Sequence, residues 1–273
     1  MYSVGGPGLT LYQNKSGFGH LDVGHDAAVP LCRWDPAPAC RSGDDYARQM
    51  IARVVSSDSS HERIRVLLLG LGCASIAAGI ANELDSFTLE AIDAVEVSEE
   101  VIAIARAQFL PVLDSCGGSK RLSNRLSIIH ADALRPHTWA AGASYTHILV
   151  DVPQIYLSFA EGHARAPQHF WAGLGHHAAS GGSLIINSWH TTHTALRNDL
   201  LDAGWGAVRT QKAGLNTLVL SSDWRSLHRP SRWSRWLRLR HHLVVNEAAL
   251  VTMLVLNLLV VCCCLCRLCT RAR

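Results

Sequence analysis

Residues 66–75 read VLLLGLGCAS, and this stretch decides the fold. An apolar run, typical of a buried strand, ends at Gly70 and Gly72, and small residues at helical spacing follow in CASIAAGIANEL at 73–84. The two glycines therefore mark a turn from a strand into a helix. Because neither glycine carries a side chain, a ligand can approach the backbone of this turn closely, as phosphates and adenosyl groups do in nucleotide-binding folds.

Short β-rich runs and helical runs alternate around this turn, from Arg63 to Asp223. Strands are predicted at 63–70, 89–97, 125–133, 145–152 and 181–189, and helices at 44–55, 73–84, 98–109, 169–179 and 194–204. Two last strands, at 206–211 and 216–222, are too close together for a crossover helix and are expected to pair as a hairpin. The pattern predicts an α/β fold: a Rossmann-like, doubly wound, mostly parallel seven-stranded sheet with an antiparallel last strand. A small β-hairpin is expected ahead of it at 17–31.

Acidic residues stand at the carboxyl ends of three consecutive predicted strands. Glu96 closes the second strand, Asp132 the third and Asp151 the fourth. In open α/β sheets a ligand binds in the crevice outside these strand ends. We therefore expect Glu96 to accept hydrogen bonds from two ribose hydroxyls, Asp132 to contact an adenine amino group and Asp151 to face the substrate. Taken singly, each acid is typical of a capping or solvated carboxylate; the three together favour a binding site.

Several blocks of the sequence resemble, in order, the signature segments of spermidine-synthase-like class I methyltransferases. The blocks are VLLLGLGCASIA (66–77), IDAVEVSEEVIAIARAQF (92–109), RLSIIHADAL (125–134), HILVDV (147–152) and APQHFWAGLGHHAASGGSLIINSW (166–189). The resemblance covers roughly residues 15–222. Within this family, the chain is similar to the spermidine-synthase-like domain of an elongation-factor methyltransferase.

The resemblance implies a cofactor and a set of residues that bind it. The cofactor is S-adenosylmethionine or its decarboxylated form, and the acceptor is a protein or a small amine. Asp151 matches the first aspartate of the aminopropyltransferase signature D-x-x-D-P and is the implied catalytic residue. The implied cofactor-binding residues are Gly70, Leu71, Gly72, Ser75, Glu96, Val97, Asp132 and Ala133.

Two departures from that signature favour methyl transfer over polyamine synthesis. Gln154, after Pro153, replaces the second aspartate, and Cys73 occupies the place of an aspartate that holds the cofactor's amine. A polyamine is a multiply charged cation, so the loss of two carboxylates weakens its binding. Methyl transfer mainly requires that the acceptor be aligned. Three hypotheses remain open: a methyltransferase, an aminopropyltransferase, and a non-catalytic binding module with the same fold.

The charges are distributed unevenly along the chain. Residues 225–273 carry nine arginines against one acidic residue, Glu247, whereas residues 1–224 carry 16 lysines and arginines against 21 acidic residues. A basic tail of this kind favours an anionic partner, either nucleic acid or lipid headgroups. Its tryptophans and arginines at 231–243 (SRWSRWLRLRHHL) stand directly before an apolar segment, which favours lipid. We therefore expect no nucleic-acid partner.

Residues 248–266 form that apolar segment, 19 residues without a charge. As a helix, the segment is about 28 Å long, close to the hydrocarbon thickness of a bilayer. It predicts a C-terminal transmembrane anchor with the catalytic domain in the cytosol, in the mitochondrial outer membrane or the endoplasmic reticulum; a buried core helix is the alternative. The expected organisation is an N-terminal hairpin region (1–45), the catalytic domain (46–223), a basic juxtamembrane segment (224–247), the span (248–266) and a short basic tail (267–273).

The nine cysteines do not have the spacing of a metal site. The first residues, MYSVGGPGLT, lack the pattern of a secretory signal, so we expect the thiols of Cys32, Cys40, Cys73 and Cys116 to be free. The five cysteines between 262 and 269 are either acylated or apolar filler. No metal is expected, and dimerisation through the N-terminal hairpin stays open.

Overall fold

The computed structural model describes the following residues: 9–13, 19–23, 32–35, 41–42, 44–56, 63–116, 122–136, 139, 142–152, 168–188, 193–214, 216–222 and 224. The chain divides into two compact units, Met1–Ser226 and Leu227–Arg273, and all described residues belong to the first. The juxtamembrane segment predicted at 224–247, apart from Trp224, and the span predicted at 248–266 lie outside the described residues. Within the described part of the chain, no helix is both long and apolar enough to cross a membrane.

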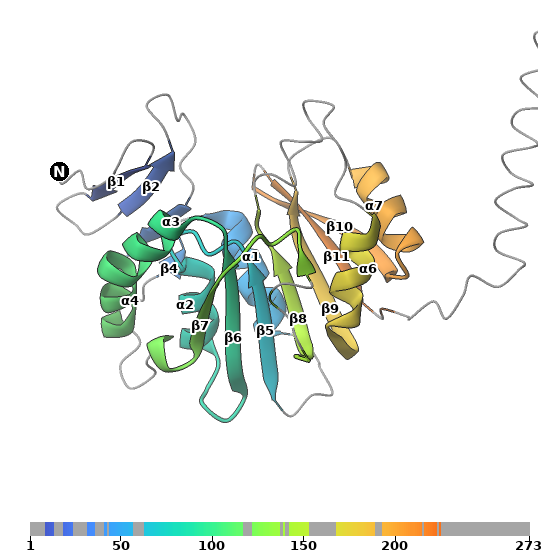
Figure 1. Cartoon of the computed structure of the whole chain (residues 1–273), viewed down its shortest axis with the longest axis horizontal. Helices are drawn as coiled ribbons and strands as arrows, with labels where there is room; N and C mark the ends of the chain where they lie inside the picture. Colours follow the sequence, from blue (N-terminus) through green and yellow to red (C-terminus); the bar gives the residue numbers. More distant parts are fainter. Residues whose placement is uncertain are drawn as a thin grey trace, which may run out of the picture. The chain divides into compact units, whose positions relative to one another are not determined.

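A seven-stranded sheet forms the centre of the first unit (Figure 1). Its strand order is β10-β11-β9-β8-β5-β6-β7, and β11 is antiparallel to both of its neighbours. The mostly parallel sheet and the closing hairpin predicted from the sequence are thus confirmed. The strands are β5 (Ile64–Leu69), β6 (Leu89–Glu96), β7 (Leu126–His130), β8 (Tyr145–Val150), β9 (Ala178–Ser188), β10 (Gly206–Ala213) and β11 (Asn216–Ser222).

Helices cover both faces of this sheet, which makes three layers (Figure 1). One face packs against α1, α2 and the α3–η1–α4 run, and the other against α6 and α7. Strand β5 is apolar from Val66 to Leu69 because Val66 and Leu68 enter one core while Leu67 and Leu69 enter the other. The helices are α1 (Asp45–Val55), α2 (Ser75–Glu83), α3 (Glu99–Ile104), η1 (Ala105–Phe109), α4 (Leu110–Cys116), the 3₁₀ turn η2 (Leu122–Asn124), α6 (Gln168–His176) and α7 (His193–Asp202).

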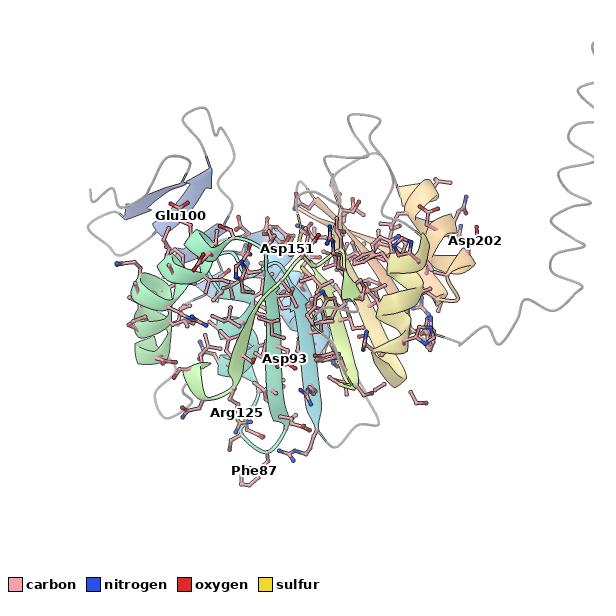
Figure 2. The ribbon with its side chains drawn as sticks, in the orientation of Figure 1. Phe87, Asp93, Glu100, Arg125, Asp151 and Asp202 are labelled. Carbon is pink, nitrogen blue, oxygen red and sulfur yellow. The ribbon has the colours of Figure 1, made fainter. Side chains whose placement is uncertain are left out.

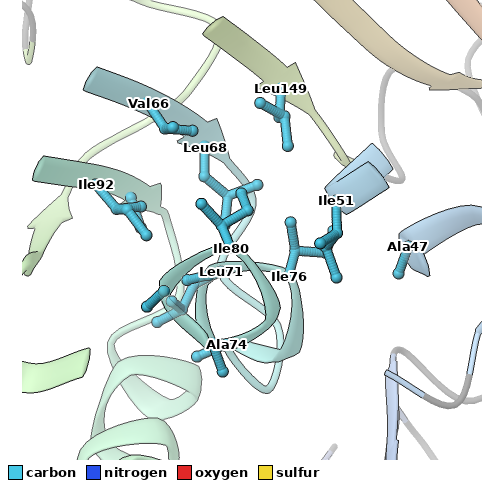
Figure 3. Packing of buried hydrophobic residues seen from close by; sticks show 14 of the residues in the cluster. Ala47, Ile51, Val66, Leu68, Leu71, Ala74, Ile76, Ile80, Ile92 and Leu149 are labelled. Atoms are coloured by element: carbon cyan, nitrogen blue, oxygen red, sulfur yellow. The ribbon is translucent and has the colours of Figure 1, made fainter. Parts of the chain in front are cut away.

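The contact between α1 and α2 is unusually close because of the small residues in α2. The amphipathic helix α1 buries Ala47, Met50, Ile51 and Val54, one stripe at helical spacing. A Cβ added at Gly79 of α2 would lie 2.3 Å from Cδ1 of Ile51, so any side chain there would force the end of the Ile51 side chain to move. Figure 3 shows Ile51 meeting the α2 side chains at this contact. The small residues read from the sequence thus let one helix dock directly on another.

The N-terminal region differs from the expected hairpin at 17–31. It contains a four-stranded antiparallel sheet, made of β1 (Leu9–Gln13), β2 (Gly19–Val23), β3 (Cys32–Asp35) and β4 (Arg41–Ser42). The first hairpin joins β1 to β2, with Leu11 opposite Leu21, so only its second strand lies in the predicted range. The prediction placed both strands within 17–31, whereas that range holds only β2, which pairs with β1 upstream and with β3 just beyond residue 31.

One cysteine also departs from expectation. Cys73 was expected to be a free thiol, but it is disulfide-bonded. Its residue is 1% exposed and lies in the turn between β5 and α2. The expectation was based on cellular compartment alone, whereas a disulfide also depends on how close the fold brings two sulfur atoms.

Candidate active site

The turn between β5 and α2 has a backbone shape that few side chains permit. Gly70, Gly72 and Ala74 all have positive φ, at 93°, 51° and 57°. A Cβ added at Gly70 would lie 2.3 Å from the carbonyl oxygen of Asp151. The glycine at position 70 is therefore required by the neighbouring strand end, and not only by an approaching ligand as the sequence suggested. A hydrogen bond also holds Asp151 beside the turn, since its backbone N–H donates to the Leu69 carbonyl at 2.8 Å.

Glu96 ties the glycine turn to the end of β6. Its carboxylate accepts hydrogen bonds from the backbone N–H of Leu71 at 3.1 Å and from those of Val97 and Ser98, each at 3.0 Å. A carboxylate offers about four acceptor positions, so one remains on Oε2 for a ligand. A ribose that is held through both hydroxyls must displace one of these backbone donors. The predicted position of Glu96 beside the turn is found.

The rest of the expected adenosine site lies along the ends of β6 and β7. Val97 is 55% exposed, an apolar side chain directly after Glu96 on which a purine ring can lie. The Ala131 N–H donates to the Glu96 carbonyl at 3.0 Å, and this bond places the chain after β7 beside Glu96. Asp132 lies in that loop, two residues beyond the end of β7, and not in the strand. Its carboxylate accepts from the Leu134 N–H at 2.9 Å and pairs with Arg135 at 3.4 Å.

Three of the expected cofactor residues have buried side chains. Leu71, Ser75 and Ala133 are 4%, 5% and 7% exposed. Leu71 packs into the core on the α2 side of the sheet, and Ala133 into the core on the α6 side. Any contact of these residues with a ligand would therefore be made mainly by backbone atoms. The same holds for Gly70 and Gly72, which have no side chain.

Asp151 lies directly after β8, at the same edge of the sheet (Figure 2). Its carboxylate accepts hydrogen bonds from two side chains of distant segments, the Tyr46 hydroxyl at 3.1 Å and the Asn187 amide at 2.9 Å. Asn187 in turn accepts from the amide of Asn216 at 2.9 Å. Helix α1 and strands β8, β9 and β11 thus each contribute one polar side chain to a single network.

The electrostatics of Asp151 are unusual for a carboxylate. Its pKa is raised to about 6: burial is the main cause and the charge of Asp44 adds to it, while the hydrogen bonds from Asn187 and Tyr46 act in the opposite direction. Burial also raises the pKa of Tyr46, as does the charge of Asp151, so its hydroxyl remains a donor. Asp151 forms no ion pair with any other residue that the structure describes. Such a carboxylate can hold a cation or accept a proton near neutral pH.

The sequence analysis missed Tyr46, Asn187 and Asn216. Asn187 follows the rule that identified the acids, because it lies at the carboxyl end of the predicted fifth strand. Tyr46 lies in a segment that was predicted to be a helix, but nothing in its spacing indicated a contact more than a hundred positions away. Asn216 opens the second strand of the closing hairpin, and no local signal marks it.

The other residues considered in the sequence analysis either pack within the fold or lie outside the described residues. Pro153, Gln154 and Trp189 are not among the described residues. His177 packs on Trp139 with ring centroids 5.8 Å apart, and desolvation lowers its pKa. Among the described residues, no three His, Cys, Asp or Glu side chains gather in a way that suits a metal ion.

Comparison with solved structures supports the class of fold that the sheet order indicates. A probable spermidine synthase from Corynebacterium glutamicum ATCC 13032 aligns with a TM-score of 0.58 and 17% identity over 84% of each chain. The spermidine synthase from Thermotoga maritima aligns with a TM-score of 0.52 and 13% identity over 81% of this chain and 71% of its own. At these identities the likeness concerns the fold alone.

An O-methyltransferase family protein from Burkholderia thailandensis aligns less completely. Its TM-score is 0.50 at 14% identity, and the match covers 66% of this chain and 57% of that one. No protein-family profile matches the sequence, and no curated protein matches it. The chain thus has the Rossmann-like fold that is shared by methyltransferases and spermidine synthases.

Proposed function

We propose that this chain is a class I methyltransferase that uses S-adenosylmethionine and methylates an amine, on a protein or on a small molecule. One observation carries the proposal: a preformed glycine turn, tied to Glu96, lies directly beside a buried carboxylate, Asp151, that has no cationic partner among the described residues. Cofactor and acceptor sites that share a strand edge are what a direct group transfer requires.

The residues of the turn fit this cofactor in chemical character. The edge of Gly70 and Gly72 offers open backbone to its amino-acid end, Glu96 keeps an acceptor position for a ribose hydroxyl, and Val97 offers an apolar surface to the adenine. Asp132, in the loop after β7, can accept from the adenine amino group. When bound, the cofactor supplies a methyl group that is activated by a positively charged sulfur.

The acceptor end is defined by Asp151. A buried carboxylate that is held by two neutral donors favours a positively charged ligand, and an ammonium group meets this requirement. An amine must lose its proton before its nitrogen can react, and a carboxyl group with a pKa near 6 can take that proton around neutral pH. Tyr46 and Asn187 fix the direction of the carboxylate, so the amine would approach from a defined side.

Aminopropyl transfer is the second candidate function, and Asp44 favours it. Asp44, the N-cap residue of α1, places another negative charge close enough to raise the pKa of both Asp151 and Tyr46. It offers a second carboxylate for a diamine, in place of the one missing at Gln154. The spermidine synthases of the comparison also align over more of the chain than the O-methyltransferase does.

Isothermal titration calorimetry of the purified full-length protein tests the cofactor site. S-adenosylmethionine should bind with measurable heat, and Glu96→Ala should weaken binding at least tenfold because charged hydrogen bonds are lost. Glu90→Ala is the matched control, since Glu90 is an exposed acid on the same strand, 4.0 Å from Arg63. A folded protein without heat would instead support a non-catalytic binding module. Tighter binding of the decarboxylated cofactor, with turnover of putrescine, would identify an aminopropyltransferase.

We also propose that residues 248–266 anchor the protein in a membrane, with the catalytic unit in the cytosol at the mitochondrial outer membrane or the endoplasmic reticulum. The support is the uncharged length of this segment and the arginines that flank it. In fractionated cells the full chain should remain with membranes after alkaline carbonate washing. A variant that lacks residues 248–266 should be released, and a full chain released by the wash would contradict the anchor.

A further inference from the structure

The orientation of one amide determines whether Asp151 receives a hydrogen bond. Asn187 is 3% exposed and lies near the end of β9, with its amide nitrogen 2.9 Å from Oδ1 of Asp151. An amide has a donor end and an acceptor end of nearly the same shape, so a half-turn exchanges them. In the reversed orientation a carbonyl oxygen would face the carboxylate, and two acceptors would repel each other. Asp151 therefore favours the observed orientation, and a donor at the other end of the amide favours it further.

We propose that Asn216 is a positioning residue of the acceptor site: by donating to Asn187 it fixes the amide with its NH₂ toward Asp151. The donor–acceptor distance from Nδ2 of Asn216 to Oδ1 of Asn187 is 2.9 Å. In the observed orientation the amide has a hydrogen bond at both ends, and the reversed orientation loses both. Because Asn187 is buried, water does not replace them at low cost. This inference rests on the proposed role of Asp151 in binding the acceptor.

The backbone holds the two asparagines on neighbouring strands. Strands β9 and β11 are antiparallel, with Leu218 opposite Asn187, so Asn216 lies two positions further along on the same side. Asn216 follows the tight turn of the β10–β11 hairpin, where Gly214 has a φ of 64°. The orientation of a residue on β9 thus depends on the register of the closing hairpin.

The hairpin is itself fixed against α1, the helix that carries the other donor to Asp151. A Cβ added at Gly214 would lie 3.0 Å from the carboxylate of Asp45, and Gln211 donates to Gln49 at 2.7 Å. Tyr46 and Asn216 therefore belong to two elements that contact each other directly. Both hydrogen bonds on Asp151 depend on this contact, so the closing hairpin is part of the acceptor site and not only an edge of the sheet.

The charge state of Asp151 reports on the amide orientation. The groups that face its carboxylate are the Tyr46 hydroxyl and the Asp44 carboxylate from α1, and the Asn187 amide from β9. Asp44 raises the pKa of Asp151, whereas the hydrogen bonds from Asn187 and Tyr46 lower it. If the Asn187 amide reverses or moves freely, its hydrogen bond is lost and the pKa of Asp151 rises.

A carboxyl ¹³C NMR titration of the full-length protein, labelled at aspartate, measures this pKa directly. The resonance that disappears in Asp151→Asn assigns the signal. Asn216→Leu removes the donor without adding a charge, and we expect the pKa of Asp151 to rise by about half a pH unit or more. Asn216→Ala, whose smaller side chain needs no extra space, should give a similar rise if the leucine variant does not fold.

The control makes the Asn216→Leu change in a variant that lacks the Asn187 amide. In the Asn187→Leu background, Asn216→Leu should leave the pKa of Asp151 unchanged, because the effect acts through Asn187. An unchanged pKa in both single variants at Asn216, or an equal rise in both backgrounds, would overturn the proposal. The titration needs neither cofactor nor acceptor, so its outcome is independent of the calorimetric test of the proposed function.

Discussion

Two aspartates, Asp93 within β6 and Asp151 directly after β8, each accept a hydrogen bond from a tyrosine, but their second donors differ. Asp93 lies in β6, is 7% exposed, and accepts from the Tyr145 hydroxyl at 3.0 Å and from Arg65 at 2.8 Å. Asp151 likewise accepts from a tyrosine, but its second donor is the neutral amide of Asn187. Figure 2 shows both residues, with Asp151 at the edge of the sheet where the glycine turn lies.

The difference distinguishes an acid that is neutralised within the fold from one that we propose binds a ligand. The guanidinium of Arg65 neutralises Asp93 and also stacks over the Tyr145 ring at 5.4 Å, so that cluster needs nothing further. At Asp151 both donors among the described residues are neutral, so burial of its charge costs stability. Sites of this kind are where a binding partner can supply the missing opposite charge. Three comparisons test the contrast.

The largest effect is expected from breaking the pair at Asp93. Arg65→Met leaves a buried carboxylate without its cation and should lower the free energy of unfolding by about 3 kcal/mol, the lower end for such pairs because Arg65 is partly exposed. Denaturant unfolding at pH 7.5 measures it. The control is Arg63→Met, which breaks the exposed contact with Glu90 and should cost under about 1 kcal/mol. Equal losses in the two variants would contradict the structural role of Asp93.

The opposite sign is expected at Asp151. Its folded pKa of about 6 lies above the usual 3.8, so the folded state binds the extra proton between these values and stability falls as pH rises through that window. Asp151→Asn removes the charge and should raise the free energy of unfolding by up to about 3 kcal/mol at pH 7.5. At pH 3.5, where both states are protonated, the gain should vanish. A pH-independent gain would show that burial of the charge is not its cause.

The smallest effect compares the two tyrosines. Tyr145→Phe leaves Asp93 with Arg65 and should cost about 1 kcal/mol, whereas Tyr46→Phe leaves Asp151 with one donor and should cost about 1.5 kcal/mol at pH 7.5. The Tyr46→Phe variant should also raise the pKa of Asp151 in the carboxyl titration. A greater loss for Tyr145→Phe would indicate that Asp151 depends little on its hydroxyl donor.

The sheet could be predicted because each strand carries its own signal. Helices cover both faces of strands such as the one ending at Leu69, so side chains on both faces must be apolar. A continuous apolar run in the sequence therefore indicates such a strand. The N-terminal strands carry weaker signals, since alternation alone does not say which two runs pair. This is why the hairpin at 17–31 was misplaced while the mostly parallel seven-stranded sheet was anticipated.

The site was predictable only in part, for a related reason. Glu96 and Asp151 follow from their places at strand ends, which local sequence reveals. The partners of Asp151 come from α1, β9 and β11, and their arrival depends on how the helix and hairpin pack against each other. Contacts of this range have no local signature in a single sequence. The disulfide at Cys73 belongs to the same class of feature.

The absent side chain at Gly79 has a consequence for how the active site can evolve. Ile51 of α1 packs against Gly79 of α2, and Tyr46 belongs to the same helix α1. The position of the Tyr46 hydroxyl relative to Asp151 therefore depends on a residue that does not contact Asp151. A methyl group added at Gly79 would force the end of the Ile51 side chain to move, and α1 moves with it only where that side chain cannot rotate aside. We therefore expect α2 to tolerate fewer substitutions than its distance from the proposed ligand site suggests. Screens for variants with altered acceptor preference should include α2.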